Sequence, residues 1–215
     1  MRRRTRQAEV PYQSEYGKYK RYLREDFVYE CVFCTVHEND LGGPRGMHVE
    51  HLRPKGMKRF ASLECEYTNL LYACPVCNSY KGRDWPSDNP VEDGKGYPDP
   101  CEVDYDHHIT VLPNCRVQGH TDVGAYLVRR LHLNRRQLVK IRKKREALKK
   151  TIENRIRMAE ATMLEAERMK ERSDLPSDIA DYFARIQENA AREKRDAEAE
   201  WQAQREPLFE MSDYV

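Results

Sequence analysis

Two pairs of cysteines, each spaced by two residues, constrain the fold of this chain more than any other feature. The pairs are Cys31/Cys34 and Cys74/Cys77, and residues 35–73 lie between them. Four thiolates complete the tetrahedral shell of a structural Zn²⁺ and leave it no open position for water. The chain has seven cysteines, and an odd number does not favour the disulfide framework of a secreted protein. We therefore expect one structural zinc, held by these four cysteines, and a reducing, cytoplasmic location.

The composition predicts a small core and long solvated helices. The 215 residues are 39% hydrophobic and 34% charged, which is too polar for one large core. No stretch approaches the roughly 18–20 apolar residues of a membrane helix, so we expect no membrane contact. We divide the chain into a basic, tyrosine-rich helical segment at 1–30, a zinc-bearing domain at 31–120 and a helical region at 121–215. The expected fold class is α+β.

A helical stripe is predicted near the start of the chain. Pro11 suits the beginning of a helix, and Tyr12, Tyr16, Tyr19 and Leu23 follow the spacing of one helical face. The tyrosines could pack on the zinc-bearing domain or stack on bases, and packing is the more common role of such a stripe.

The second half of the chain is predicted to be turns followed by helices. Residues 84–120 are rich in proline and glycine, which predicts turns with short strands at most. Thr121 suits the N-cap of a following helix, and Asn134 that of a longer one. Two narrow apolar stripes then follow helical spacing on either side of a break at residues 173–176. They predict an antiparallel helical hairpin, which could dock a partner or join copies of the chain in a homo-oligomer.

Positive charge gathers in two places, although the formal net charge is only +2. Basic residues crowd the first 24 positions and again positions 135–150. Two such blocks suggest a surface for a polyanion. Ordinary solvated helix faces would give the same pattern, and both interpretations stay open.

The segment between the two cysteine pairs and the residues directly after Cys77 hold side chains suited to phosphodiester hydrolysis. That reaction needs a base that takes a proton from water and a hard cation at the phosphate. His51 titrates near neutral pH and can be the base. Glu50 offers carboxylate oxygens and Asn78 an amide oxygen, which suit Mg²⁺ or Mn²⁺. Adjacent strand residues face opposite sides, so Glu50 and His51 share a site only where the strand ends or bends.

These residues follow one another in a recognisable order. Between and after the two CxxC turns the chain carries, in sequence, Glu50, His51, Pro54, Asn69, Asn78 and Lys81. This order resembles the zinc-bearing branch of the HNH nucleases, which have a small ββα-metal core. The resemblance implies that His51 is the general base, that Glu50 and Asn78 hold the catalytic metal, and that Asn69 braces the loop between two strands. The family more often has aspartate where this chain has glutamate.

A narrower resemblance covers about half the chain. The string at residues 48–55, together with residues 99–101, 107–108 and 131–142, is similar to the HNH subunit of Septu and retron-associated bacterial defence systems. This resemblance implies a DNA endonuclease that acts in antiviral defence beside an ATPase partner. Arg53, Lys55 and Lys81 would contact neighbouring phosphates of the DNA. The alternative is a zinc-ribbon module that binds nucleic acid or docks a protein without catalysis.

Two further groups of residues are open to more than one interpretation. His48, two positions before Glu50, could be an added metal ligand, a phosphate contact or a structural histidine. A second metal site is disfavoured because the spacings of its candidate ligands are irregular: Cys101, His107, His108, Cys115 and His120.

Overall fold

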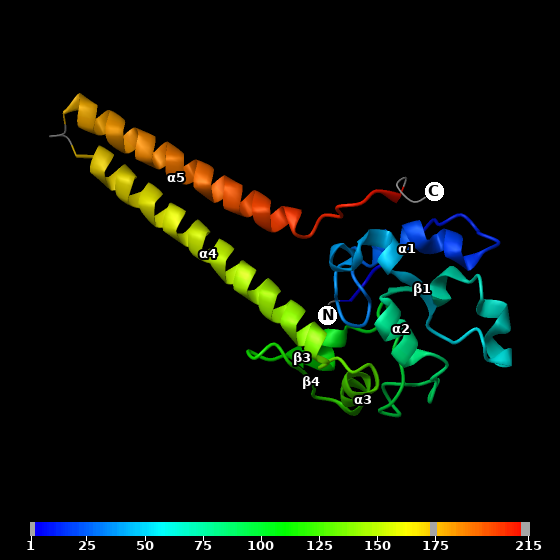
Figure 1. Ribbon diagram of the computed structural model, residues 1–215. Coiled ribbons are helices and arrows are strands. Elements are labelled where there is room, and N and C mark those ends of the chain that lie inside the picture. Colours follow the sequence, from blue (N-terminus) through cyan, green and yellow to red (C-terminus); the bar gives the residue numbers. More distant parts are fainter. Residues whose placement is uncertain (1–2, 173–175, 212–215) are drawn as a thin grey trace. The chain divides into compact units, whose positions relative to one another are not determined.

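The computed structural model describes residues 3–172 and 176–211. The chain divides into two compact units, one made of Met1–Arg142 with Pro207–Val215 and the other of Lys143–Glu206. The first unit mixes short helices and strands, whereas the second is a helical hairpin (Figure 1). The α+β class and the long hairpin are therefore confirmed.

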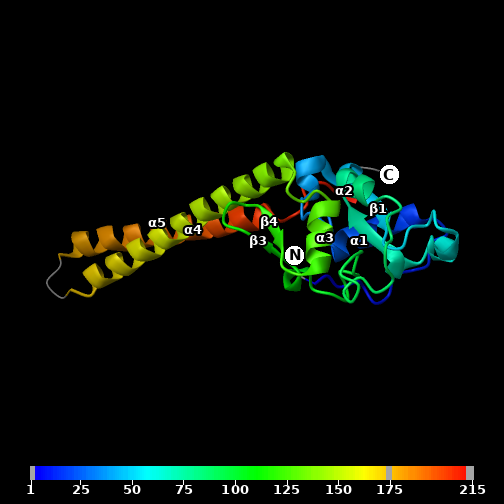
Figure 2. The ribbon, with the colours of Figure 1, turned by 90° about the horizontal axis from the view of Figure 1, so that it is seen from below.

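The centre of the first unit is a two-stranded antiparallel sheet and the helix that follows it. Strand β1 (His48–His51) pairs with β2 (Leu70–Ala73), and Glu50 lies opposite Leu71. All of β2 is buried, so this strand runs through the core. Helix α2 (Pro75–Lys81) begins directly after β2 and lies beside β1 (Figure 2).

Large apolar side chains from distant segments surround β2. Helix α1 (Lys20–Asp26) contributes the buried side chain of Leu23, and the turn between the first two cysteines contributes that of Phe33. The large side chains that are most deeply buried in this core, including one from β2 itself, are Leu23, Phe27, Phe33, Tyr72, Tyr97 and Leu127. They explain how a chain of low apolar content still forms one continuous core in this unit.

The predicted N-terminal helix starts later than Pro11. A 3-10 turn covers Tyr16–Tyr19 and leads into α1. Tyr19 is buried, but Tyr12 is 79% exposed. The backbone N–H of Gln13 donates to the Tyr19 hydroxyl, at 2.9 Å, so the segment before the turn uses this bond in place of helical ones.

The proline-rich region forms turns and one small sheet, as predicted. Strands β3 (Ile109–Val111) and β4 (Val117–Gly119) pair antiparallel, and helix α3 (Asp122–Arg130) follows. The Thr121 hydroxyl accepts the backbone N–H of Gly124 at 3.2 Å, which confirms Thr121 as the N-cap.

Asn134 does not cap the long helix. Its side chain accepts the Val117 N–H at 2.7 Å and donates to the Val117 carbonyl at 2.8 Å. These two bonds pair the backbone N–H and carbonyl groups of Val117 in β4. Helix α4 (Arg136–Lys170) begins two residues after Asn134. Leu131, Leu133 and Leu138 are buried in the first unit, so the predicted region 121–215 is divided between the two units.

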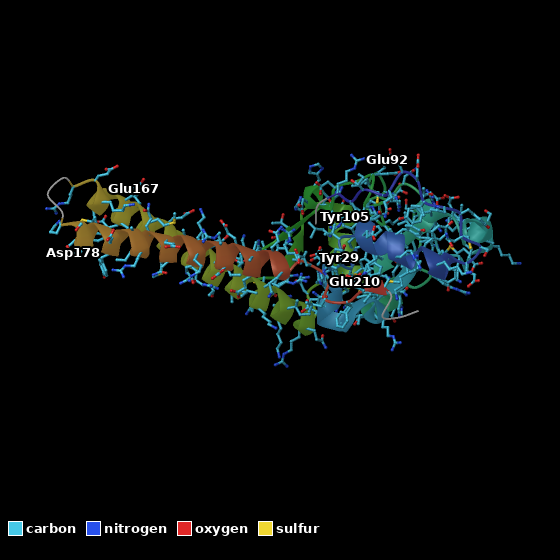
Figure 3. All side chains as sticks on the ribbon, turned by 90° about the horizontal axis from the view of Figure 1, so that it is seen from above. Tyr29, Glu92, Tyr105, Glu167, Asp178 and Glu210 are labelled. Atoms are coloured by element: carbon cyan, nitrogen blue, oxygen red, sulfur yellow. The ribbon has the colours of Figure 1, made fainter. Side chains whose placement is uncertain are left out.

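The second unit consists of α4 from Lys143 onward and α5 (Ser177–Ala203), which run antiparallel (Figure 1). Their contact is lined by small buried side chains, among them Ala159 and Ala190. Charged side chains project along both helices, up to the labelled Glu167 near the end of α4 and Asp178 at the start of α5 (Figure 3). Of the predicted break at residues 173–176, residues 173–175 lie outside the described residues. None of the helices in the described ranges is both long and apolar enough to cross a bilayer.

Candidate metal centre and adjoining site

The four predicted zinc ligands meet in the core of the first unit. The Sγ atoms of Cys31, Cys34, Cys74 and Cys77 all lie within 4.8 Å of one another, and all four residues are buried. The Cys34 and Cys74 sulfurs are 3.7 Å apart, too far for a disulfide. Zinc with Zn–S bonds of about 2.3 Å spaces its tetrahedral sulfurs by about 3.8 Å. The donor set and its spacing therefore fit a structural zinc.

Local structure explains how the sulfurs converge. The first pair lies in a turn closed by the Cys31 N–H to Val36 carbonyl bond, at 2.9 Å. The second pair straddles the start of α2, where the Cys74 sulfur accepts the Cys77 N–H at 3.4 Å. Hydrogen bonds from the neighbouring cysteines lower the pKa of Cys74. The Val32 N–H donates to the Tyr72 carbonyl at 2.9 Å, which fixes the first turn against β2.

Two residues of β1 each contact one residue of α2: His48 contacts Asn78, and Glu50 contacts Lys81. His48 and Glu50 lie two residues apart on one face of β1, and Asn78 and Lys81 lie three apart on α2. The Asn78 Nδ2 atom is 3.0 Å from Nδ1 of His48. Because Nδ2 can only donate, the His48 Nδ1 atom accepts, and the Asn78 amide oxygen is turned away from this bond.

Glu50 is paired with a buried lysine. The Lys81 ammonium lies 2.8 Å from Oε1 of Glu50 and 2.7 Å from the His51 carbonyl, and Lys81 is 0% exposed. Burial raises the pKa of Glu50, and the Lys81 charge opposes this shift. Burial likewise lowers the pKa of Lys81, against the pull of Glu50. Lys81 is predicted from the sequence to contact phosphate; its ammonium is enclosed here and bonded to Glu50 and to the His51 carbonyl.

The His51 ring has contact partners of its own. Its Nε2 atom is 2.9 Å from the Glu64 carbonyl, and the Tyr16 ring packs edge-on at 4.9 Å. A carbonyl only accepts, so Nε2 carries the proton and Nδ1 keeps its lone pair. Burial lowers the pKa of His51, which favours the neutral ring. Within the described residues, no hydrogen bond joins this ring to Glu50 or Asn78.

Asn69 makes the hydrogen bonds of a loop brace. Its Oδ1 atom accepts the Arg53 N–H at 2.8 Å, and its Nδ2 donates to the carbonyls of Arg53 and Leu63 at 3.1 and 3.2 Å. The side chain is 1% exposed. It therefore ties both ends of the segment that separates His51 from β2.

The other two predicted phosphate contacts are exposed. Lys55 forms an ion pair with Glu64 at 2.7 Å, and its ammonium lies 4.0 Å from the centre of the Tyr16 ring. Arg53 lies over Trp85 and lines a cavity of about 220 Å³. That cavity is also lined by the acidic residues Asp88, Glu92, Asp99 and Glu102.

Much of the N-terminal basic block is used inside the molecule. Arg4 pairs with Glu30 at 2.7 Å, and Arg6 pairs with Asp99 at 3.0 Å. The Arg3 Nε atom donates to the Cys101 carbonyl at 2.8 Å. These arginines fasten the N-terminal segment within the first unit. Arg2 lies outside the described residues.

The second basic block is divided. Arg142 donates to the carbonyls of Leu133 and Cys115, at 2.8 and 3.3 Å. Arg135 faces the cysteine cluster: its Nη2 atom is 3.5 Å from the Cys77 sulfur. No pattern in the sequence indicates this role of Arg135, since a basic residue at a helix start ordinarily lies in solvent. The Lys81–Glu50 pair likewise has no signal in the sequence.

The candidate ligands of a second metal site do not gather. Within the described residues, the only cluster of three or more histidine, cysteine or acidic ligands is the four-cysteine one. His108 instead pairs with the Thr121 hydroxyl at 2.9 Å, and His120 with Thr110 at 3.3 Å.

Comparison of the chain with protein-family models, with curated proteins and with solved structures found no match.

Proposed function

We propose that this chain is a metal-dependent endonuclease of the HNH type, with β1, β2 and α2 as its ββα-metal core. The observation that carries the proposal is the packing of α2 against β1 beside the cysteine cluster. This packing brings Asn78 to 3.0 Å from His48, on the strand that also carries Glu50 and His51. Asn78 and His48, which are 30 positions apart in the sequence, thus meet beside the cysteine cluster, and this contact supports the proposal.

His51 would act as the general base. Its neutral ring holds a proton on Nε2, bonded to the Glu64 carbonyl, and Nδ1 can take a proton from a water molecule. The water would then attack the phosphorus in line, leaving a 5′ phosphate and a 3′ hydroxyl.

Glu50 and Asn78 would hold Mg²⁺ or Mn²⁺, which neutralises charge on the phosphate when bound. Carboxylate and amide oxygens are the donors that such hard cations prefer. The Asn78 amide nitrogen bonds to His48, which leaves the amide oxygen as the available donor. Glu50 has two carboxylate oxygens, and Lys81 is bonded to Oε1.

The substrate we propose is DNA, and the biological role is antiviral defence beside an ATPase partner. Both follow from the resemblance to the Septu and retron-associated HNH subunit. Cytoplasmic location, which rests on the cysteine pattern, and oligomerisation, which rests on the apolar stripes of the hairpin, remain predictions from the sequence.

A second candidate function is a non-catalytic zinc module that binds nucleic acid or docks a protein. The Glu50–Lys81 pair favours it, because a lysine already supplies a cation at the carboxylate that would bind the metal.

Cleavage of supercoiled plasmid separates the two candidates. We expect nicking with Mg²⁺ or Mn²⁺, none without added divalent ion, and a loss of about 10²–10⁴-fold in rate for His51→Ala. His107→Ala is the matched control, since His107 is an exposed histidine outside the site. Equal nicking by wild type and His51→Ala would remove His51 from its role. DNA binding without cleavage under any divalent ion would favour the non-catalytic module.

A further inference from the structure

One guanidinium faces the cysteine cluster from outside. The Nη2 atom of Arg135 lies 3.5 Å from the sulfur of Cys77 and 3.9 Å from those of Cys34 and Cys74. It therefore approaches three of the four thiolates with one amino group. The contact joins positions 58 to 101 residues apart in the chain.

The charge of a loaded centre gives this contact a physical role. Four thiolates and one Zn²⁺ carry a net charge of about −2. The four cysteines are at most 3% exposed, so water screens little of that charge. An arginine stays protonated and its N–H groups form charge-assisted hydrogen bonds to anions. Arg135 can thus offset part of the negative charge that burial makes costly.

Arg135 also lies at a structural junction. It is the residue before α4, and its backbone N–H donates to the His132 carbonyl at 2.9 Å. Its Nη1 atom donates to the Leu131 carbonyl at 3.2 Å. The side chain of Arg135 therefore links the turn between α3 and α4 to the sulfurs. Leu133 in this turn and Leu138 in the first part of α4 are both buried in the core.

We propose that Arg135 is a positioning residue of the zinc centre, and that zinc binding through this residue orders the junction from which α4 starts. The guanidinium strengthens zinc binding by compensating thiolate charge. In return, the charged centre holds the segment 131–142 in place. The proposal concerns the zinc centre alone and does not depend on hydrolase activity.

Zinc affinity of the full-length chain tests the first half of the proposal. Competition with a chromophoric chelator would compare wild type with Arg135→Gln, Arg135→Lys and Arg136→Gln. Residues that orient or support metal ligands typically change affinity by about 10–100-fold. We expect a loss of that size for Arg135→Gln and a smaller one for Arg135→Lys, which keeps the charge but loses the planar fork. Arg136→Gln is the matched control, because Arg136 is the exposed arginine next along the chain.

Amide hydrogen exchange tests the second half. Chelation of zinc should speed exchange at residues 131–142 by a similar factor in wild type and in the Arg136→Gln control. The factor should be smaller in Arg135→Gln, where the contact with the sulfurs is already missing. In zinc-loaded Arg135→Gln, the same amides should already exchange faster than in zinc-loaded Arg136→Gln.

Each outcome decides the proposal. Equal zinc affinities for Arg135→Gln and Arg136→Gln overturn it, as does equal exchange at the junction in the two loaded proteins. Should Arg135→Gln fail to fold, Arg135→Lys carries the test, and wild-type affinity and exchange in that variant count against the proposal.

Discussion

The Lys81 ammonium donates to Oε1 of Glu50 at 2.8 Å, and the two side chains are 0% and 9% exposed. The pair joins α2 to β1 at the strand that also carries the proposed base. Its burial makes it the most consequential ion pair of the candidate site, since removing one partner leaves a charge enclosed without compensation.

Lys81→Met should therefore destabilise the protein by about 3–5 kcal/mol, the usual cost of breaking a buried pair from one side. Urea unfolding measures this free energy. The double variant Lys81→Met with Glu50→Leu should recover much of the loss, because no buried charge remains unpaired. Lys58→Met is the control at an exposed lysine. If the single variant were as stable as this control, the pair would have no structural role.

The cysteine cluster should hold about one zinc ion per chain, measured by elemental analysis. Cys74→Ser should abolish zinc binding, whereas Cys65→Ser should retain it, because Cys65 lies outside the cluster. Chelation should unfold the first unit and leave the helical circular dichroism of Lys143–Glu206, which forms a separate unit. Retention of zinc by Cys74→Ser would contradict the assignment of the ligands.

Asn69→Ala should cost about 2–4 kcal/mol of unfolding free energy, because it removes three hydrogen bonds and leaves buried backbone groups unpaired. Hydrogen exchange should rise in residues 52–68, the segment that Asn69 braces. Thr68→Ala, at the exposed neighbouring position, should change stability by less than about 0.5 kcal/mol. Similar losses in both variants would argue against a specific brace.

His108 should make stability depend on pH. Burial lowers the pKa of His108 in the folded protein, and the nearby His107 and His120 lower it further. The unfolded chain then binds a proton first as pH falls, so unfolding free energy should decrease as pH drops below about 6.5. Urea unfolding at about pH 7.5 and pH 5.5 should show a smaller pH effect for His108→Gln than for wild type. His107→Gln, at the exposed neighbour, should behave like wild type, and an unchanged pH effect in His108→Gln would refute the assignment.

Sequence patterns predicted the features that depend on short-range spacing. The CxxC spacing predicted the four-cysteine cluster because two residues in one tight turn must lie close together. Thr121 was predicted as an N-cap because its hydroxyl reaches the N–H three residues on. The 3/4 spacing of apolar residues predicted the hairpin, since one helical face repeats with that period. It overextended the first helix, because Tyr12 shares the spacing of Tyr19 but lies in solvent.

The sequence alone therefore determined the four-cysteine cluster, the α+β class and the helical hairpin. Tertiary structure alone decided which charges are buried and what they contact. Lys81 and Arg135 are ordinary basic residues by sequence, yet one pairs with Glu50 and the other faces three sulfurs. Arg4 and Arg6 belong to a basic block by sequence, yet each is bound to a carboxylate far along the chain. The physical reason is that no local period encodes a contact between residues tens of positions apart. Such partners are fixed only when the core brings their segments together and removes water from between them.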